Sequence, residues 1–255
     1  MRSRPRGEDP YEQSTIAWLK FQQAHGIRGT YYIGTWGRYD TPSDARDLVY
    51  SRRDPEVQWL AKTCERFGAE VGLHSSIHAW TTPERFSTEV QRVRESYGVE
   101  AHGFRGHYWS LDATNPERSL RIAAASELKH SSALGMNTVG GFRRGSCYPY
   151  RPFDRSTGDY VGLCEVPPTL MDQALFQSGA DNLARIQYFK TLAETVRKNE
   201  GVLVLDWHSD SLWPGYMDGV TDALLPELAQ ISNDSDCWLA SAQQISDWCT
   251  TARWQ

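Results

Sequence analysis

The chain has 255 residues, of which 40% are hydrophobic and 23% are charged, and its formal net charge at pH 7 is -5. These values are typical of a globular protein long enough to bury a full core. The net charge is negative and no basic stripe is visible in the sequence, so we expect no nucleic-acid partner. No apolar run approaches the roughly 18 residues of a membrane span, and the N-terminus lacks an apolar leader. We therefore expect no membrane span and a cytoplasmic location.

The pattern alternates short apolar strands with amphipathic helices. Proline after a capping residue opens several helices, as at Asp54 and Asn115, and glycine ends others, as at Gly26. In chain order we predict a helix over 11–24, a strand over 27–33, a helix over 55–67, a strand over 69–73, a helix over 82–97, a strand over 101–104, a helix over 115–128, a strand over 130–133, an ordered loop over 140–159, a strand over 163–167, a helix over 181–199, a buried strand over 201–208, and helices over 221–231 and 241–252.

This alternation predicts an α/β fold with a parallel sheet, either open or closed. No repeat or linker interrupts it, so we expect one domain over residues 1–255, with residues 1–10 flexible. The five cysteines form no C-x-x-C pair and are expected to be reduced thiols. In parallel α/β folds the functional residues gather at the carboxyl ends of strands. His74, Arg105 and His208 each follow a predicted strand.

His74 and His78 are four residues apart. On one helical turn this spacing places both imidazoles on one face, where they can share a metal ion. The alternative is that they are two polar residues in a loop between a strand and a helix. The position at a strand end, with the small residues Ser75 and Ser76 between them, leaves both interpretations open.

Asp206, His208 and Asp210 alternate at the end of the predicted strand over 201–208. If the strand continues, its period of two puts all three side chains on one side. They are then candidates for an acid–base cluster or a second metal site, and otherwise they are polar residues that end a strand. A histidine supported by a buried strand, with a pKa near neutrality, suits a general acid.

Arg105 could hold a catalytic carboxylate through a forked pair of hydrogen bonds, or it could form a surface salt bridge. The aromatic residues next to these candidates, Tyr108, Trp109 and Trp207, are expected to bind substrate, because Tyr and Trp stack on the apolar faces of sugars as well as filling cores.

Five segments, in this order, resemble the polysaccharide-deacetylase family, which comprises the NodB-homology carbohydrate esterases. They are 27–33, 70–78, 103–108, 165–172 and 205–208. The resemblance implies a distorted (β/α) barrel of seven strands or fewer. It also implies a metal-dependent hydrolase that removes acetyl groups from a sugar or a cell-surface polysaccharide precursor.

Carried onto this chain, the resemblance makes His74 and His78 ligands of Zn²⁺ or another divalent metal. It makes His208 the general acid and Arg105 the residue that orients the base. Asp206, from its place two residues before His208, is expected to be a further catalytic residue. The partner is an acetylated carbohydrate, and the oligomeric state is left open.

The sequence departs from the family at its acidic first strand, because only a short Pro- and Gly-rich segment precedes Tyr11. Three explanations stay open. The first strand is missing from this chain, or the acids come from elsewhere, or the protein is a non-catalytic glycan-binding or scaffold relative with an incomplete metal site. The candidates for acids from elsewhere are Asp40, Asp172, Asp206 and Asp210.

Overall fold

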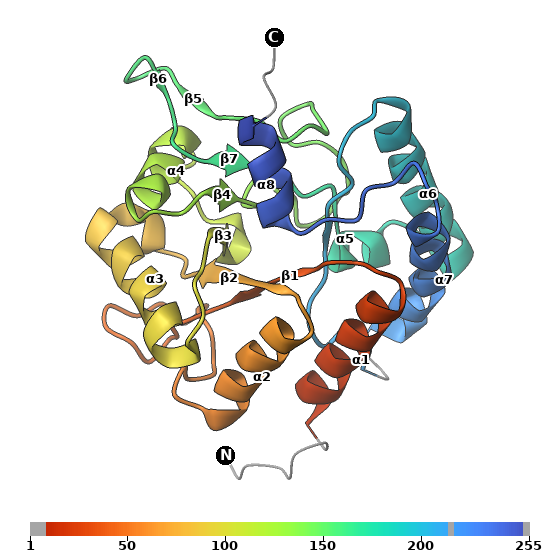
Figure 1. Cartoon of the computed structure of the whole chain (residues 1–255), viewed down its shortest axis with the longest axis horizontal. Coiled ribbons are helices and arrows are strands. Elements are labelled where there is room, and N and C mark those ends of the chain that lie inside the picture. The colour runs from red at the N-terminus through yellow and green to blue at the C-terminus, as the bar shows by residue number, and fades with distance from the viewer. Residues whose placement is uncertain (1–8, 214–216, 252–255) are drawn as a thin grey trace. The chain divides into compact units, whose positions relative to one another are not determined.

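The computed structural model describes residues 9–213 and 217–251. Helices and strands alternate along most of this length (Figure 1), as the sequence predicts. The elements, with η marking short 3₁₀ helices, are α1 (Pro10–Ala24), β1 (Thr30–Ile33), α2 (Pro55–Arg66), β2 (Glu70–Ser75), η1 (Ala79–Thr81), α3 (Pro83–Tyr97), β3 (Gly103–Gly106), η2 (His107–Trp109), α4 (Pro116–Ala125), β4 (His130–Ser131), β5 (Phe153–Asp154), β6 (Asp159–Tyr160), β7 (Cys164–Glu165), β8 (Leu170–Met171), α5 (Asp172–Gln177), α6 (Asn182–Lys198), β9 (Leu205–Asp206), η3 (Met217–Gly219), α7 (Val220–Ser232) and α8 (Ala242–Thr251).

The described residues group into two compact units. The sheet unit comprises residues 29–134, 148–167 and 240–251, and the helical unit comprises 9–28, 135–147, 168–213 and 217–239. Each unit is described by itself below. The single domain expected over the whole chain stays a prediction.

The sheet unit is built on five parallel strands in the order β1-β2-β3-β4-β7. Helices α2, α3 and α4 connect the first four strands, as parallel pairing requires. Strand β3 covers Gly103–Gly106 and not the predicted 101–104, so Arg105 lies within the strand. The register brings Leu73 opposite Phe104 and His74 opposite Arg105.

Several helices begin and end where the sequence signals place them. The side chain of Asp9 accepts the backbone N–H groups of Tyr11 and Glu12 at the start of α1. Thr82 caps α3 in the same way, and Gly98 ends α3 with a φ of 70°, a left-handed conformation that favours glycine. Of the segment expected to be flexible, residues 1–8 lie outside the described residues, whereas Asp9 and Pro10 form the start of α1.

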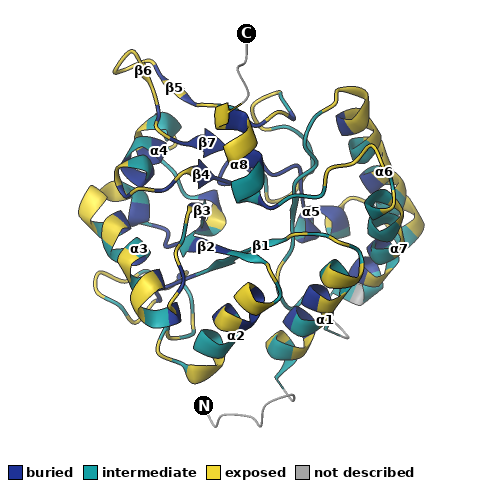
Figure 2. Cartoon of the chain, in the orientation of Figure 1, coloured by how far each residue is buried: buried dark blue, intermediate teal, exposed yellow. Residues whose placement is uncertain are grey.

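Helices cover one face of the sheet. Both α2 and α3 contact β2, and the ring of Phe86 on α3 meets that of Phe104 on β3 edge to face, with centroids 5.0 Å apart. Both phenylalanines are fully buried, and Figure 2 shows buried residues in strands β2, β3, β4 and β7 and on parts of the helices. Replacing such a side chain by alanine costs about 3–5 kcal/mol, so this contact fixes α3 on the sheet.

The same sheet carries polar side chains inside the unit. Glu70 accepts hydrogen bonds from Thr30 Oγ1 at 2.8 Å and from the backbone N–H of Gln243 at 2.9 Å, and it lies 2.6 Å from Nε2 of His130. His130 is fully buried, and a Cβ at Gly103 would lie 1.9 Å from its ring. Glycine at position 103 therefore makes room for a buried histidine–glutamate pair.

The helical unit holds a short parallel pair, β8 and β9, in which Leu170 lies opposite Leu205. Helix α5 contacts β8, α6 and α7, and α6 also packs on α7. The indole N–H of Trp18 on α1 donates to Ser211 Oγ at 3.0 Å. These contacts hold the segment that follows β9 against α1.

Two predictions about elements are wrong. The segment 201–208 was expected to be a buried strand. Only Leu205–Asp206 is a strand, because the segment pairs with β8 over two residues, and both of these residues are half-buried. Most of the predicted loop over 140–159 is irregular, but Phe153–Asp154 (β5) pairs with β6 as an antiparallel hairpin. In the connecting turn, the backbone N–H groups of Ser156 and Gly158 donate to Asp154. The apolar composition of a segment therefore does not determine how many of its residues will pair with a neighbouring strand.

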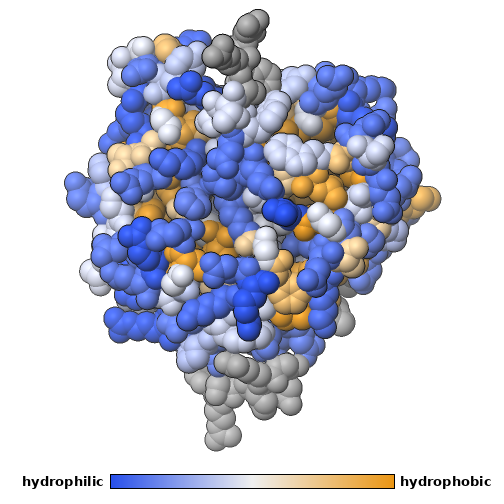
Figure 3. Space-filling model, viewed as in Figure 1, coloured by the Kyte–Doolittle hydropathy of each residue, from blue (hydrophilic) through white to orange (hydrophobic). Residues whose placement is uncertain are grey.

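Hydrophilic residues predominate on the face of the molecule in Figure 3, with apolar residues in separate small patches. Within residues 9–213 and 217–251, no helix combines the length and apolar character that crossing a membrane would need.

Candidate functional site

The carboxyl ends of β2 and β3 bring His74 and Arg105 side by side, because these residues are register partners. His107 follows β3 directly, and its ring lies 5.0 Å from that of His74, edge to face. The parallel sheet thus gathers two histidines and an arginine from segments about 30 residues apart in sequence, as expected for strand ends in this fold class. His107 was assigned no role in the predicted site, although its position two residues after Arg105 indicates that it could face the same cavity.

His78 does not share a helical turn with His74, which corrects the expected geometry. His74 lies in β2, and His78 lies in the turn that precedes η1. Nε2 of His78 is 2.9 Å from Oδ2 of Asp44. Asp44 also accepts two hydrogen bonds from the guanidinium of Arg46, at 2.9 and 2.7 Å. These bonds, with smaller contributions from the Arg46 backbone and from His78, hold the pKa of the Asp44 carboxyl well below its usual range.

A second carboxylate, Asp47, lies in the same loop and is almost fully buried. Its Oδ1 accepts the backbone N–H of Ile77 at 2.9 Å and lies 3.5 Å from Nδ1 of His107, while its buried Oδ2 has no hydrogen-bond partner. Asp40, not Asp47, was the candidate expected from this loop. Asp40 accepts the N–H of Gly37 at 2.8 Å and pairs with Arg92 at 3.2 Å, so it shapes the loop.

Asp44 and Asp47 were therefore missed. The signal that could have found them is their position, since they lie in the loop that follows the carboxyl end of β1, where a parallel sheet collects functional residues. No apolar or charge periodicity marks that loop.

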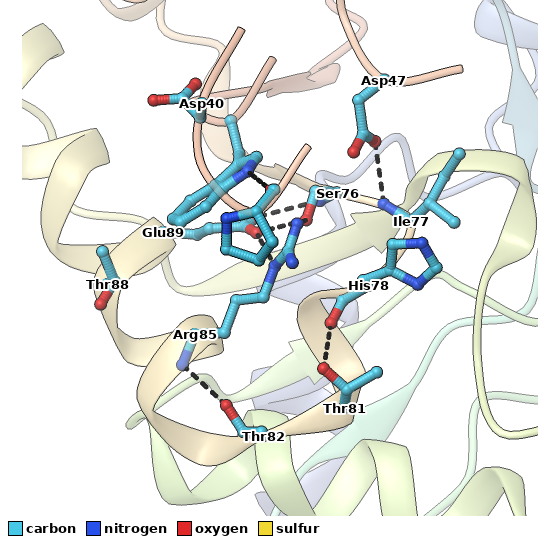
Figure 4. Close-up of polar contacts among 12 residues, drawn as sticks. Asp40, Asp47, Ser76, Ile77, His78, Thr81, Thr82, Arg85, Thr88 and Glu89 are labelled. Carbon is cyan, nitrogen blue, oxygen red and sulfur yellow. Dashed lines mark hydrogen bonds and ion pairs between the residues drawn. The ribbon is translucent and has the colours of Figure 1, made fainter. Parts of the chain in front are cut away.

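A third carboxylate, Glu89 of α3, contacts Ser76, two residues before His78 (Figure 4). It is fully buried and binds Ser76 through both the backbone N–H and the hydroxyl of that residue. Burial raises the pKa of Glu89 to about 7, against the opposing effect of the Ser76 hydrogen bonds and of Arg85.

Arg105 donates to the carbonyl oxygen of Ser132 at 3.1 Å and to its hydroxyl at 2.8 Å, and its guanidinium lies 4.6 Å from the centre of the Tyr32 ring. Burial raises the pKa of the nearby Glu165 carboxyl, and the charge of Arg105 opposes that change. The predicted role of Arg105 in orienting a catalytic base stays a prediction.

Tyr108 and Trp109 lie in η2, and both have a φ of 55°. Tyr108 is 60% exposed and its ring lies 4.6 Å from that of His107, whereas Trp109 is buried. Left-handed backbone at a non-glycine residue costs about 1–3 kcal/mol and is often found at functional sites. Tyr108 is accordingly an accessible aromatic ring, and Trp109 is mainly a packed one.

The helical unit contains the other histidine that the sequence singled out. Nδ1 of His208 is 2.9 Å from Oδ1 of Asp172, and the His208 backbone N–H donates to Oδ2 at 2.8 Å. Asp172 is fully buried at the start of α5. Its hydrogen bond to His208, against the opposing effect of burial, raises the pKa of His208 to about 9.

The remaining predicted residues of this unit take different places. Strand β9 ends at Asp206, so His208 lies beyond the strand and Asp210 lies in a turn. The strand does not continue, and of the two interpretations left open the one in which these polar residues end a strand describes the backbone. Burial raises the pKa of Asp210. Trp207 donates its indole N–H to Thr221 Oγ1 at 3.2 Å.

Among the residues that the structure describes, no three His, Cys, Asp or Glu side chains are placed so that they could hold a metal ion. At one of the two predicted ligands, His78, Nε2 is hydrogen-bonded to Asp44 in this arrangement. The donor set in this arrangement does not fit the expected Zn²⁺ or other divalent metal.

No family model and no curated protein matches the chain. A solved structure from Mycobacterium smegmatis, named as a putative polysaccharide deacetylase, matches with a TM-score of 0.66 at 16% identity. The match covers 94% of this chain and 78% of the Mycobacterium smegmatis chain. The Xyl-CE4 domain of a xylanase from the hindgut metagenome of Trinervitermes trinervoides has 12% identity, covers 92% and 83%, and has a TM-score of 0.49. A family 4 carbohydrate esterase from Streptomyces lividans has 15% identity, covers 90% and 85%, and has a TM-score of 0.44. The first of these confirms the predicted resemblance at the level of architecture: the chain has the α/β fold of a polysaccharide-deacetylase structure.

Proposed function

We propose that this protein is a hydrolase that removes acetyl groups from a sugar or a cell-surface polysaccharide precursor. One observation carries the proposal. At the strand ends of a deacetylase-like fold, His78 lies against Asp44 and His107 lies against Asp47, and the ring of His107 meets that of His74. Histidine–carboxylate pairs are the groups that activate water and move protons in hydrolysis.

His208 is assigned the role of general acid. When water adds to an acetyl carbonyl, the tetrahedral intermediate collapses only after the departing sugar nitrogen or oxygen receives a proton. A histidine whose pKa is about 9 carries that proton at neutral pH. Asp172 holds the ring through Nδ1, which leaves Nε2 to donate.

His74 and His78 are assigned the activation of water, with Asp44 as the carboxylate that orients the His78 ring. Arg105 is assigned the positioning of a base, and Asp206 a supporting acid–base role beside His208. Zn²⁺ or another divalent metal enters the proposal only through His74 and His78. No step is assigned to a metal, because the side chains as placed do not fit one.

Tyr108 is the aromatic residue best suited to contact a sugar, because its ring is 60% exposed next to His107. The apolar face of a pyranose stacks on such a ring. Trp109 is assigned a supporting role in the sheet unit, where it is buried. Trp207 is assigned one in the helical unit, where it donates its indole N–H to Thr221.

A second function, glycan binding without catalysis, is favoured by one observation. In the described part of the chain, the predicted metal ligand His78 is engaged by a carboxylate and no metal-binding group of three is formed. A protein of this kind would bind acetylated glycans with an affinity that does not change when a chelator is added.

Acetate release from a panel of N- and O-acetylated glycans tests the proposal, with Zn²⁺ added and with a chelator. We expect turnover by the parent and its loss in His74→Ala, His78→Ala and His208→Ala. His102→Ala is the matched control, because His102 is exposed and was given no role in the site. Glycan binding without acetate release in every metal condition would establish the second function instead.

A further inference from the structure

The main chain between His74 and His78 is held by two buried carboxylates (Figure 4). The backbone N–H of Ser76 donates to Oε2 of Glu89 at 2.8 Å, and the next N–H, that of Ile77, donates to Oδ1 of Asp47 at 2.9 Å. Two consecutive amides thus bind two different acids. The Ser76 hydroxyl adds a short third bond, to Oε1 of Glu89.

These acids reach the segment from separate elements. Glu89 projects from the middle of α3, whereas Asp47 comes from the loop after β1. Both side chains have no exposed surface. Burying a carboxylate costs several kcal/mol unless hydrogen bonds compensate it, so neither acid is explained by packing alone.

The surroundings of Glu89 keep its carboxyl group in place. Arg85, one turn earlier on α3, lies 3.6 Å from Oε1 of Glu89 and donates to Ser76 Oγ at 3.2 Å. The Arg85 guanidinium is in turn covered by the ring of Trp36 at 4.6 Å. The Glu89–Ser76 contact is therefore part of a closed polar cluster and not a flexible surface pair.

We propose that Glu89, through Ser76, is a positioning residue that fixes the separation and direction of His74 and His78, with Asp47 acting in parallel through Ile77. His74 belongs to a strand and is oriented by the sheet, whereas His78 lies in a turn, where the peptide planes before it set where its ring points. The inference rests on the proposed function only for the role of these histidines, and the geometry it predicts is independent of turnover.

Glu89→Gln tests the role of this carboxylate. Glutamine offers one acceptor oxygen where Glu89 offers two, so Ser76 loses the acceptor of either its N–H or its hydroxyl. Glu95→Gln is the matched control, because Glu95 is exposed on the same helix and bonds only locally, to Gln91 at 2.6 Å. Ser76→Ala is a second variant, which removes the hydroxyl and leaves the fold's backbone bonds intact.

The readouts are hydrogen exchange at the Ser76 amide and the imidazole NMR signals of His74 and His78, recorded without substrate. We expect Glu89→Gln to accelerate exchange at Ser76 about tenfold and to shift both imidazole signals, with neither change in Glu95→Gln. Ser76→Ala should shift the His78 signal in the same direction. Where the parent releases acetate, kcat should fall about tenfold in Glu89→Gln, with KM unchanged.

Faster exchange at Ser76 with unmoved imidazole signals would overturn the inference, because Glu89 would then only stabilise the fold. If Glu89→Gln does not fold, unmoved imidazole signals in Ser76→Ala overturn it. A parent that releases no acetate defeats the proposed function and leaves this positioning test intact, since its first two readouts need no substrate.

Discussion

Each unit of the molecule contains a histidine bound to an aspartate, but the two pairs are built differently. In the helical unit, Asp172 is fully buried and binds both the ring and the backbone of His208. In the sheet unit, Asp44 shares its oxygens between His78 and Arg46, whose side chain is 63% exposed. The presence of a carboxylate beside a histidine therefore does not by itself determine its effect on the imidazole. What else the carboxylate binds decides how strongly it acts on the ring.

The largest expected effect comes from removing the charge of Asp172. In Asp172→Asn the pKa of His208 should fall from about 9 toward its ordinary value of about 6.5, because the main cause of the increase is lost. The change corresponds to a loss of more than about a hundredfold in proton affinity. An NMR titration of the imidazole measures it.

Asp222→Asn, on the exposed side of α7, is the control for that titration. A His208 that still titrates near pH 9 in Asp172→Asn would show that the buried carboxylate is not the cause.

The two units should lose stability at opposite ends of the pH scale. The folded pKa of His208 is raised above its unfolded value, so its contribution is full below a pH of about 6.5 and is lost as the pH rises through about 9. Burial raises the pKa of Glu70, but its bonds with His130, Gln243 and Thr30 outweigh burial and lower it. The contribution of Glu70 is therefore present above its unfolded value of about 4.3 and is lost as the pH falls through the folded pKa.

Thermal unfolding measured against pH checks both signs. We expect His208→Gln to flatten the alkaline side of the profile and Glu70→Gln to flatten the acidic side. An exchange of these two effects, or a profile that neither variant changes, would contradict the assignment.

A smaller change in pKa should follow when Asp44 loses its arginine side-chain partner and keeps its histidine partner, as in the Asp172 pair. Arg46→Met removes the two guanidinium bonds, so the pKa of Asp44 should rise toward its ordinary range. Carboxyl carbon NMR measures this change. Arg38→Met is the control, because Arg38 lies in the same loop and donates to Tyr39 instead. An equal rise in both variants would remove Arg46 as the cause.

The smallest effect concerns strained backbone. Tyr108→Gly should stabilise the sheet unit by about 1 kcal/mol, because glycine adopts positive φ without steric cost, and it should also weaken glycan binding. Glu200→Gly is the matched change in the helical unit, where φ is 51°, and it should leave glycan binding unchanged. Equal glycan affinity in both variants would argue against a role for the Tyr108 ring.

The sequence predicted what local chemistry and periodicity control. The helix start at Thr82 carries its own capping group, and the alternation of elements placed His74 and Arg105 at neighbouring strand ends. The resemblance to deacetylases rested on such local segments, and the fold confirms it.

The parts that could not be predicted depend on contacts between distant segments. Asp47 binds Ile77 across 30 residues, and Asp44 binds His78 across 34, so no local pattern reveals either pair. The burial expected for 201–208 failed for the same reason, because composition suggested a core strand and the number of partners decided otherwise.

The hydrogen bond from Ile77 to Asp47 limits which residues can stand at position 77. Asp47 binds the main chain of Ile77 and not its side chain, so position 77 is constrained by size and by the presence of a backbone N–H. A library randomised at this codon should retain apolar residues of similar volume. Proline, which has no N–H to offer, should be absent from the folded members.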